Sequence, residues 1–191
     1  MAKTVVGIGG TLRANSSSEL LVRAVLAECE KLGAKTRMFD GPTLALLPHY
    51  NPEVAERSDG QRTFVEAIRG ADALVISSPG YHGGVSGVVK NAIDLLEDTR
   101  SDARVYFDGM PVGLIVSAAG WQAGGVTLAA LRGIVHAMRG WPTPVGISLN
   151  SIEQKPFAPD GSLKDSGLAE TVALQARQLM GFRLETRNPQ C

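Results

Sequence analysis

Two kinds of segment alternate along the chain: short strand-like runs, and longer stretches in which apolar residues recur every three to four positions. The short runs are rich in Val, Ile and Leu, indicate strands, and fall at residues 5–9, 35–39, 73–78, 112–117 and 145–149. The longer stretches indicate amphipathic helices and fall at residues 16–32, 61–69, 86–98, 126–139 and 162–184. Such alternation predicts an α/β fold, with a parallel sheet covered by helices on both faces.

Five predicted strands suit the order 2-1-3-4-5 of a flavodoxin-like three-layer sandwich. We expect one domain over residues 1–191. In such sheets ligands bind at the carboxyl ends of the strands, near the point where the strand order reverses. The loops after strands one, three and four should therefore carry the site. Residues 41–60 form a long Pro- and Gly-bearing connection, and loops of that length are usually functional or mobile.

The loop after the first predicted strand combines glycines with side chains that can donate hydrogen bonds to a phosphate. Gly9 and Gly10 end the strand, and the donors that follow are Thr11, Arg13, Ser16 and Ser18. A helix begins directly after them, and a helix N-terminus offers free backbone N–H groups and the positive end of the helix dipole. The pattern predicts a phosphate site. An alternative is that Ser16 and Glu19 form only a capping box for this helix, and both functions are compatible.

The segment lacks residues that two common phosphate-binding loops require. A nucleoside triphosphate P-loop ends in Gly-Lys-Ser/Thr, and no such lysine is present. The dinucleotide fingerprint Gly-x-Gly-x-x-Gly starts well at Gly7 and Gly9, but Leu12 stands where the third glycine belongs. We therefore expect a loop that surrounds a terminal monophosphate.

The loops after the third and fourth predicted strands, at residues 78–87 and 117–125, share another composition. Each is rich in glycine and carries one aromatic residue, Tyr81 in the first and Trp121 in the second. Glycines let backbone N–H groups approach a ligand edge, and the aromatic side chains supply flat apolar surface. Together with the first loop they predict a ligand that has a phosphate and a planar ring.

Composition narrows the class of protein. The formal net charge is zero and no basic run is present, so a nucleic-acid partner is not expected. No apolar stretch approaches the roughly 20 residues of a membrane span, and the N-terminus shows no signal peptide, so we expect a cytoplasmic protein without a membrane partner. Cys29 falls on the apolar face of a predicted helix and Cys191 ends a polar tail, which predicts no disulfide framework.

Three motifs resemble the family of NADPH-dependent FMN reductases, which includes quinone, azo and chromate reductases. Residues 10–16 match its Gly-Ser-x-Arg-x-x-Ser loop. Residues 79–81 followed by 87–94 match its Pro-x-Tyr and Gly-x-x-Lys-Asn-x-x-Asp segments, and residues 117–125 match its third loop more loosely. Two positions depart from the family, which often has Glu where Gly80 stands and Asn where His82 stands. Loss of the acidic side chain is expected to open the pocket.

The resemblance implies FMN as cofactor, NADPH or NADH as hydride donor, and an assignment of residues. The FMN phosphate would be held by Thr11, Arg13, Ser16 and Ser18. The isoalloxazine ring would be lined by Pro79, Gly80, Tyr81 and His82, and closed on the far side by Ser117 and Gly120. Lys90 and Asp94, one helical turn apart, are expected to form an ion pair that steadies their helix.

Catalysis is then expected to rest on the flavin N5 rather than on a side chain. The three histidines, His49, His82 and His136, lack the spacing of metal ligands, so no metal is expected. His82 is the one candidate proton donor to an acceptor, although such a residue more often hydrogen-bonds the ring edge or faces solvent.

The expected activity is FMN-dependent NAD(P)H oxidation with ping-pong transfer to a flavin, quinone or azo acceptor. Tyr81, Trp121 and residues 41–60 would shape the cavity that donor and acceptor share. Family members commonly form dimers or dimer pairs, and apolar helix positions such as Leu95 and Leu96 leave room for a homodimer or homotetramer. Two alternatives remain open: a flavodoxin-type electron carrier, and a Rossmann-type enzyme in which Asp40 binds a ribose.

Overall fold

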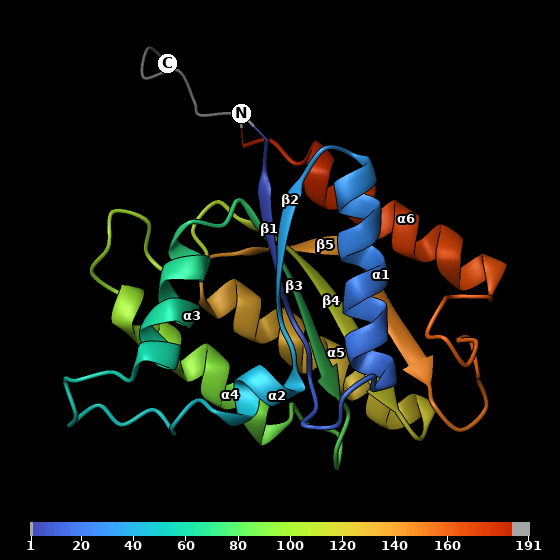
Figure 1. The fold of residues 1–191 in the computed structure, drawn as a ribbon, viewed down its shortest axis with the longest axis horizontal. Coiled ribbons are helices and arrows are strands. Elements are labelled where there is room, and N and C mark those ends of the chain that lie inside the picture. Colours follow the sequence, from blue (N-terminus) through green and yellow to red (C-terminus); the bar gives the residue numbers. More distant parts are fainter. Residues whose placement is uncertain (1, 185–191) are drawn as a thin grey trace.

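A five-stranded parallel sheet forms the centre of the computed structural model, which describes residues 2–184 (Figure 1). The strand order β2-β1-β3-β4-β5 confirms the predicted order and fold class. The strands are β1 Thr4–Ile8, β2 Lys35–Phe39, β3 Ala73–Pro79, β4 Pro111–Ala118 and β5 Trp141–Asn150. Every residue of β3, the middle strand, is buried, as expected for a parallel strand covered on both faces.

The helices follow the predicted alternation, and most begin at a polar capping residue. Ser16, Ser58 and Ser86 each accept a hydrogen bond from the backbone N–H three residues later, which satisfies one free donor of the first turn. The elements are α1 Ser17–Lys31, α2 Gly41–Ala45, α3 Asp59–Arg69, α4 Gly87–Asp94, the 3-10 helix η1 Leu95–Thr99, α5 Trp121–Ala137 and α6 Ser166–Gly181.

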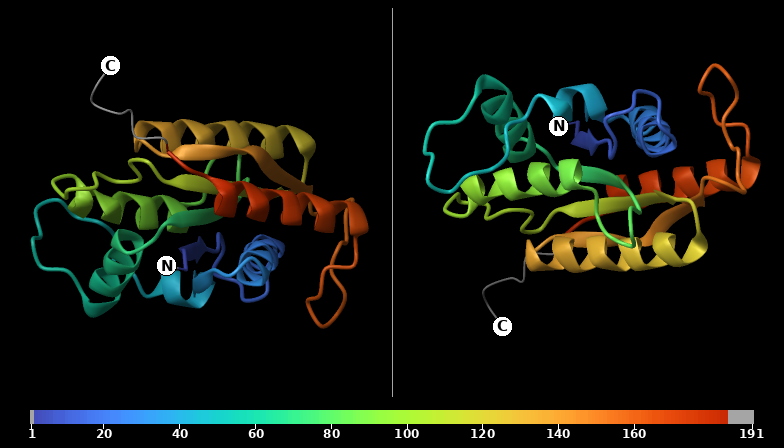
Figure 2. Two further views of the ribbon diagram at one scale, coloured as in Figure 1. Left: turned by 90° about the horizontal axis from the view of Figure 1, so that it is seen from above. Right: turned by 90° about the horizontal axis from the view of Figure 1, so that it is seen from below.

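Two apolar clusters hold the helices on opposite faces of the sheet. One cluster joins α1 and α6 to the sheet through residues such as Leu21, Val25 and Leu179. The other joins α3, α4 and α5 through residues such as Phe64 and Leu131. Figure 2 shows α1 beside α6, with α5 on the opposite side of the sheet. Burial of these apolar side chains is the main force that fixes the sandwich.

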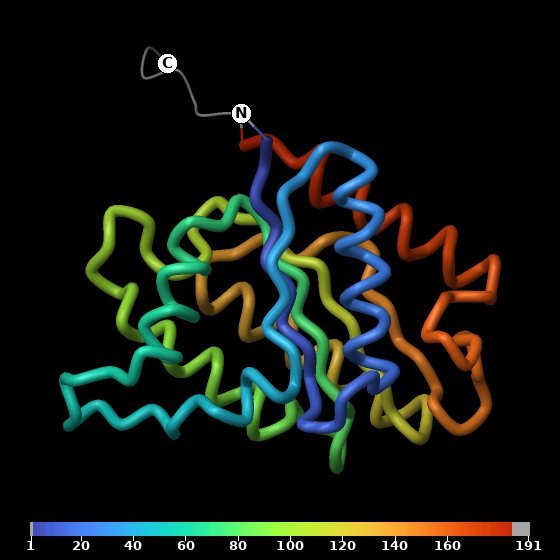
Figure 3. The backbone as a smooth tube through the Cα atoms, in the orientation of Figure 1, coloured from blue at the N-terminus to red at the C-terminus, as the bar shows by residue number. Residues whose placement is uncertain are grey.

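The strand register brings four loops to one edge of the sheet. Ile8 lies opposite Ile76, Pro79 opposite Ser117, and Ala118 opposite Asn150. The carboxyl ends of β1, β3, β4 and β5 therefore lie close together. Figure 3 shows the segments that follow them gathered along the lower edge of the molecule.

Several predicted boundaries were wrong, for local reasons. β5 begins at residue 141 rather than 145, because it is an edge strand and tolerates Pro142 and Pro144. The predicted helix 86–98 changes to a 3-10 helix after Asp94, and α5 begins at Trp121 rather than at residue 126. The last helix begins at residue 166, capped by Asp165, and ends at 181, while the connection 41–60 contains the short helix α2.

Burial corrects one expectation and confirms another. Leu95 and Leu96 are fully buried in the core, so they offer no apolar surface for an interface between copies of the chain. Cys29 is buried on α1, as predicted, and burial raises the pKa of its thiol to about 12. Cys191 lies outside the described residues. Within residues 2–184, none of the helices has both the length and the apolar character needed to cross a membrane.

Candidate functional site

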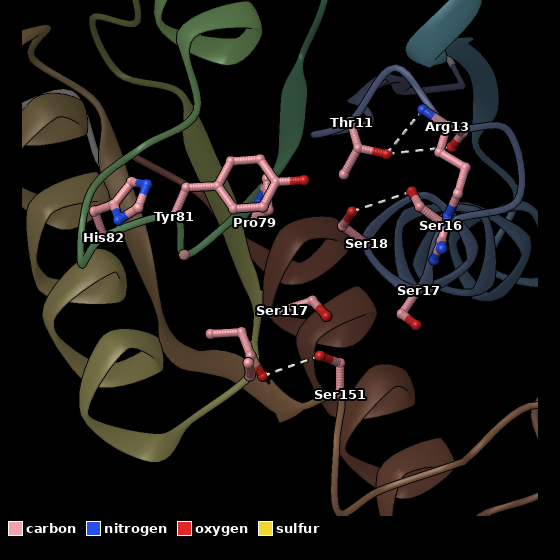
Figure 4. A pocket seen from close by; sticks show the side chains of 13 residues that line it. Thr11, Arg13, Ser16, Ser17, Ser18, Pro79, Tyr81, His82, Ser117 and Ser151 are labelled. Atoms are coloured by element: carbon pink, nitrogen blue, oxygen red, sulfur yellow. Dashed lines mark hydrogen bonds between the residues drawn. The ribbon is translucent and has the colours of Figure 1, made fainter.

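A cavity of about 340 Å³ opens at the carboxyl edge of the sheet (Figure 4). It collects residues from the loops after β1, β3, β4 and β5. Nine of the ten side chains or glycines predicted for the site line it, and the exception is Gly120, which caps α5. The lining residues are Thr11, Arg13, Ser16, Ser17, Ser18, Pro79, Gly80, Tyr81, His82, Ser117, Ala118, Ala119 and Ser151.

The serine-rich start of α1 forms one end of the cavity. Ser16 and Ser18 are nearly fully buried, and their hydroxyl oxygens lie 3.2 Å apart. Ser16 Oγ also accepts a hydrogen bond from the backbone N–H of Glu19 at 3.3 Å. The expected capping box is only half formed, because the Glu19 carboxylate binds Arg23 at 2.9 Å instead of returning to Ser16. The first turn of α1 therefore directs backbone N–H groups and hydroxyls toward this end of the cavity.

Thr11 fixes the turn that carries Arg13. Its hydroxyl accepts a hydrogen bond from the Arg13 backbone N–H at 3.1 Å and lies 3.2 Å from the Arg13 carbonyl oxygen, to which it donates. The Arg13 side chain extends past Ser16 toward Ser17 (Figure 4). Among residues 2–184 its guanidinium has no carboxylate within ion-pair distance. This end of the cavity thus presents a positive charge that no carboxylate of residues 2–184 neutralises.

The loop after β1 is held tightly against the end of β3. At Gly10 an added Cβ would lie 2.3 Å from the Ser77 carbonyl oxygen, so only glycine fits this close backbone approach. The Ser86 hydroxyl donates to the Gly10 carbonyl at 3.0 Å, and the Ser86 N–H donates to Ser78 Oγ at 2.9 Å. These buried hydrogen bonds fix the loop after β1 relative to the loop after β3.

Gly80 lies where the loop after β3 packs closely against β4 and α5. Its N–H donates to the Ser117 carbonyl at 2.9 Å, which joins the loops after β3 and β4. A Cβ at this position would lie 2.9 Å from the Ala118 Cβ and 3.1 Å from the Ala123 carbonyl oxygen. The space that a side chain would need is therefore occupied by β4 and the first turn of α5.

Tyr81 and His82 belong to a tight turn at the cavity mouth. The Gly84 N–H donates to the Tyr81 carbonyl at 3.0 Å, and φ is positive at both central residues, 53° at His82 and 75° at Gly83, as in a type I′ turn. Asn, Asp and His tolerate this conformation better than most residues. The Tyr81 ring extends across the cavity toward Thr11, whereas His82 lies beyond Tyr81, at the other end of the labelled residues (Figure 4).

Four lining residues were not predicted: Ser17, Ala118, Ala119 and Ser151. Ser151 follows β5, and its N–H and hydroxyl donate to the Ala118 carbonyl at 2.8 and 3.2 Å. The rule that places ligands near the switch point gave no reason to examine the loop after β5. The Asn-Ser pair that ends this strand is the one signal in the sequence, since such residues favour turns and hydrogen-bond nearby backbone.

Several residues expected near the ligand lie elsewhere. Trp121 begins α5, is 53% exposed, and donates from Nε1 to Glu153 Oε2 at 3.0 Å, outside the cavity lining. None of residues 41–60 lines the cavity. Asp40 caps α2 by accepting bonds from Thr43, and this hydrogen bonding, with the nearby Arg23, holds the pKa of Asp40 below its usual value. A structural function thus accounts for the carboxylate that the Rossmann-type alternative assigned to a ribose.

The predicted ion pair on α4 is confirmed, with Lys90 Nζ 2.6 Å from Asp94 Oδ1. It lies outside the cavity and stabilises its helix, as expected. A search of residues 2–184 finds no group of three or more His, Cys, Asp or Glu side chains placed to hold a metal ion.

The two ends of the cavity suit different parts of one ligand. The α1 end supplies hydroxyls, backbone N–H groups and Arg13, which together fit a phosphate. The end formed by Pro79, Gly80 and Ala118 carries no charged or hydroxyl side chain, and fits the apolar face of a planar ring.

Comparison with known proteins agrees with this arrangement. The family model described as NADPH-dependent FMN reductase matches residues 4–154. An "FMN-dependent NADPH-azoreductase" of Staphylococcus aureus is 29% identical over 181 residues, which cover 91% of each chain.

Among solved structures, the NAD(P)H:acceptor oxidoreductase FerB of Paracoccus denitrificans has a TM-score of 0.76 at 22% identity, covering 94% of this chain and 96% of its own. An oxidoreductase of Corynebacterium diphtheriae has a TM-score of 0.70 at 19% identity, with 94% and 96% coverage. These structures share the fold. The family match spans all the strands and all four loops of the cavity, and the chain therefore belongs to the NADPH-dependent FMN reductase family.

Proposed function

We propose that this protein is an FMN-dependent NAD(P)H oxidoreductase that delivers electrons to a flavin, quinone or azo acceptor. The observation that carries the proposal is the cavity itself, which joins a phosphate end and a planar end across loops far apart in the sequence. The similar S. aureus azoreductase, whose name specifies FMN and NADPH, supports the same cofactor and donor.

The residues present fit FMN. The phosphate would be held by the hydroxyls of Thr11, Ser16 and Ser18 and by the Arg13 guanidinium, all of which line one end. Pro79, Gly80 and Ser117 would lie along the ring. When bound, FMN accepts a hydride from NAD(P)H and supplies two electrons to an acceptor. The chain then contributes binding and orientation, and it supplies no obligatory acid or base.

The open mouth of the cavity favours ping-pong kinetics. Tyr81 is 61% exposed, and the turn that bears it leaves the planar end of the cavity accessible from solvent. Donor and acceptor both need access to the same exposed part of the cofactor, so one must leave before the other enters. Parallel lines in double-reciprocal plots of NADPH against acceptor would support this order, and intersecting lines would contradict it.

The decisive experiment is the absorbance spectrum of the purified protein, followed by NADPH and NADH oxidation with a panel of acceptors. A flavin spectrum, or its appearance on addition of FMN, together with acceptor-dependent NADPH oxidation, is expected. A protein that binds FMN but does not oxidise NADPH or NADH alone would be an electron carrier instead. A protein that binds no flavin would refute the proposal.

We further propose a homodimer or homotetramer as the working form. Support comes from the large apolar side chain of Leu12, which is exposed beside the cavity, rather than from the buried Leu95 and Leu96. Multi-angle light scattering on the FMN-loaded protein tests this, and a monomer at micromolar concentration would contradict it.

A further inference from the structure

The turn after β5 adds a surface to the cavity that the family motifs do not include. Ser151 lines the cavity, and the next residues, Ile152 and Glu153, are exposed beside it. On the adjacent loop Ala119 lines the cavity and Trp121 follows two residues later. The Trp121–Glu153 hydrogen bond of 3.0 Å therefore joins the two loops directly outside the cavity.

This surface is held in a defined shape. Asn150 is 2% exposed, and its side-chain oxygen accepts hydrogen bonds from the N–H groups of Ile152 and Glu153 at 3.1 and 3.2 Å. The Asn150 N–H in turn donates to the side-chain oxygen of Gln154 at 2.9 Å. The carboxylate of Glu153, on this hydrogen-bonded turn, thus holds the indole of Trp121 through its Nε1–H group.

The same turn places a cation next to the cavity. The Lys155 ammonium group donates to the carbonyl of Ser151, a lining residue, and the Lys155 side chain is exposed. An ammonium group has three donors, so others are available to a ligand. The carboxylate of Glu153 is engaged by Trp121. An apolar ring and a positive charge are therefore both tied to residues 151–153, the turn that borders the cavity through Ser151.

We propose that Trp121 and Lys155 form an acceptor subsite that favours planar aromatic acceptors bearing a negatively charged group. Glu153 is a positioning residue that acts through the Trp121 ring. The inference rests on the proposed function, because the acceptor must reach the cofactor cavity from this side. Stacking on an exposed aromatic ring contributes about 0.5–1.5 kcal/mol, equivalent to roughly a two- to tenfold change in affinity.

Kinetics with matched acceptors test the assignment. Lys155→Met should raise KM for 1,4-naphthoquinone-2-sulfonate about two- to fivefold and leave KM for the uncharged 2-methyl-1,4-naphthoquinone unchanged. Trp121→Ala should raise KM for both acceptors about two- to tenfold, with kcat, the KM for NADPH and the Kd for FMN kept within twofold. Lys35→Met is the charge control. It removes an exposed lysine at the start of β2, the strand at the other end of the sheet order from β5.

Glu153 provides a test that separates positioning from simple charge. Glu153→Gln removes the charge but keeps an oxygen that accepts the Trp121 Nε1–H bond, so the KM for the uncharged acceptor should stay near the wild-type value. Glu153→Leu removes the bond and should raise that KM toward the value of Trp121→Ala. Equal values for the Gln and Leu variants would overturn the positioning function.

Fluorescence supplies a readout that does not depend on turnover. The chain has two tryptophans, and Trp141 lies at the amino end of β5, away from the cavity. In FMN-loaded Trp141→Phe protein, the sulfonated quinone should quench Trp121 saturably, and Lys155→Met should weaken that binding about two- to fivefold. In Trp121→Phe protein, Trp141 should show no saturable quenching.

Three results would overturn the subsite. These are unchanged acceptor KM in Trp121→Ala, an equal rise in the KM for NADPH, and loss of FMN from the same variant. If the wild-type protein oxidises no NADPH, the proposed function fails, whereas the fluorescence titration still decides whether Trp121 and Lys155 bind the anionic ring.

Discussion

Replacing Arg13 by alanine should weaken FMN binding through its phosphate alone. Arg13 lines the α1 end of the cavity and, among the described residues, has no carboxylate partner, so its charge is available to a ligand. A charge-assisted hydrogen bond is worth about 1.5–3 kcal/mol, or roughly 10- to 150-fold in affinity. The side chain is exposed, and solvent screening places the expected loss near the lower end, about tenfold.

Comparison of two flavins isolates the phosphate contribution. Apo-protein titrated with FMN should show this loss in Arg13→Ala, whereas riboflavin, which lacks the phosphate, should bind both proteins equally. Arg13→Lys should recover part of the affinity, because it keeps the charge but loses the bidentate geometry. Arg177→Ala is the matched control, since Arg177 is an exposed arginine on α6 outside this cavity.

The salt dependence provides a second check on the same reasoning. FMN affinity of the wild-type protein should fall with added salt, and the fall should be smaller in Arg13→Ala. Equal losses of FMN and riboflavin affinity in the variant would show that Arg13 stabilises the loop rather than the phosphate. That result would refute the phosphate assignment of Arg13.

Tyr81→Ala removes an exposed ring that extends across the cavity mouth, so the KM for NADPH or acceptor should rise while FMN is retained. A colourless protein with normal turnover at saturating FMN would show instead that Tyr81 holds the flavin. His82→Asn should change the rate of stopped-flow oxidation of the reduced enzyme by benzoquinone less than tenfold between pH 5 and 9, because His82 is exposed and the acceptor can take its proton from water. A loss above a hundredfold would identify His82 as the proton donor. Burial raises the pKa of Cys29 to about 12, so the unfolded chain releases this proton at lower pH than the folded protein. The free energy of unfolding should therefore fall as pH rises above about 9. In urea melts Cys29→Ala should flatten that fall, and an unchanged dependence on pH would contradict the reasoning.

The fold was predictable because its determinants are local and repetitive. Alternation of strand-like runs with amphipathic stretches specified a parallel sheet, and five strands suited one common order, which the structure confirms. The errors lie where tertiary position overrides local preference. Pro142 and Pro144 argue against a strand, yet an edge strand accommodates them because one side of its backbone needs no partner.

The site was predictable as far as each loop has a chemical signature. Glycines, hydroxyls and Arg13 indicated phosphate, and the structure gathers these residues with the ring-lining loop around one cavity. Ser151 was missed because its place depends on β5 reaching Asn150 beside Ala118, a register that the sequence does not encode locally. Trp121 was expected in the cavity because it lies in the right loop. The earlier start of α5 and the bond to Glu153 place its ring outside.

The two departures from the family pattern have separate physical reasons. At His82 the backbone requires a positive φ, a conformation that asparagine also tolerates, so either residue maintains the turn that presents Tyr81. At Gly80 the constraint is space, because a side chain would press on Ala118 and on the first turn of α5. A glutamate there would require α5 to move outward and would carry Trp121 with it. The position of the α5 start, rather than the missing acid alone, therefore decides what can approach the mouth of the cavity.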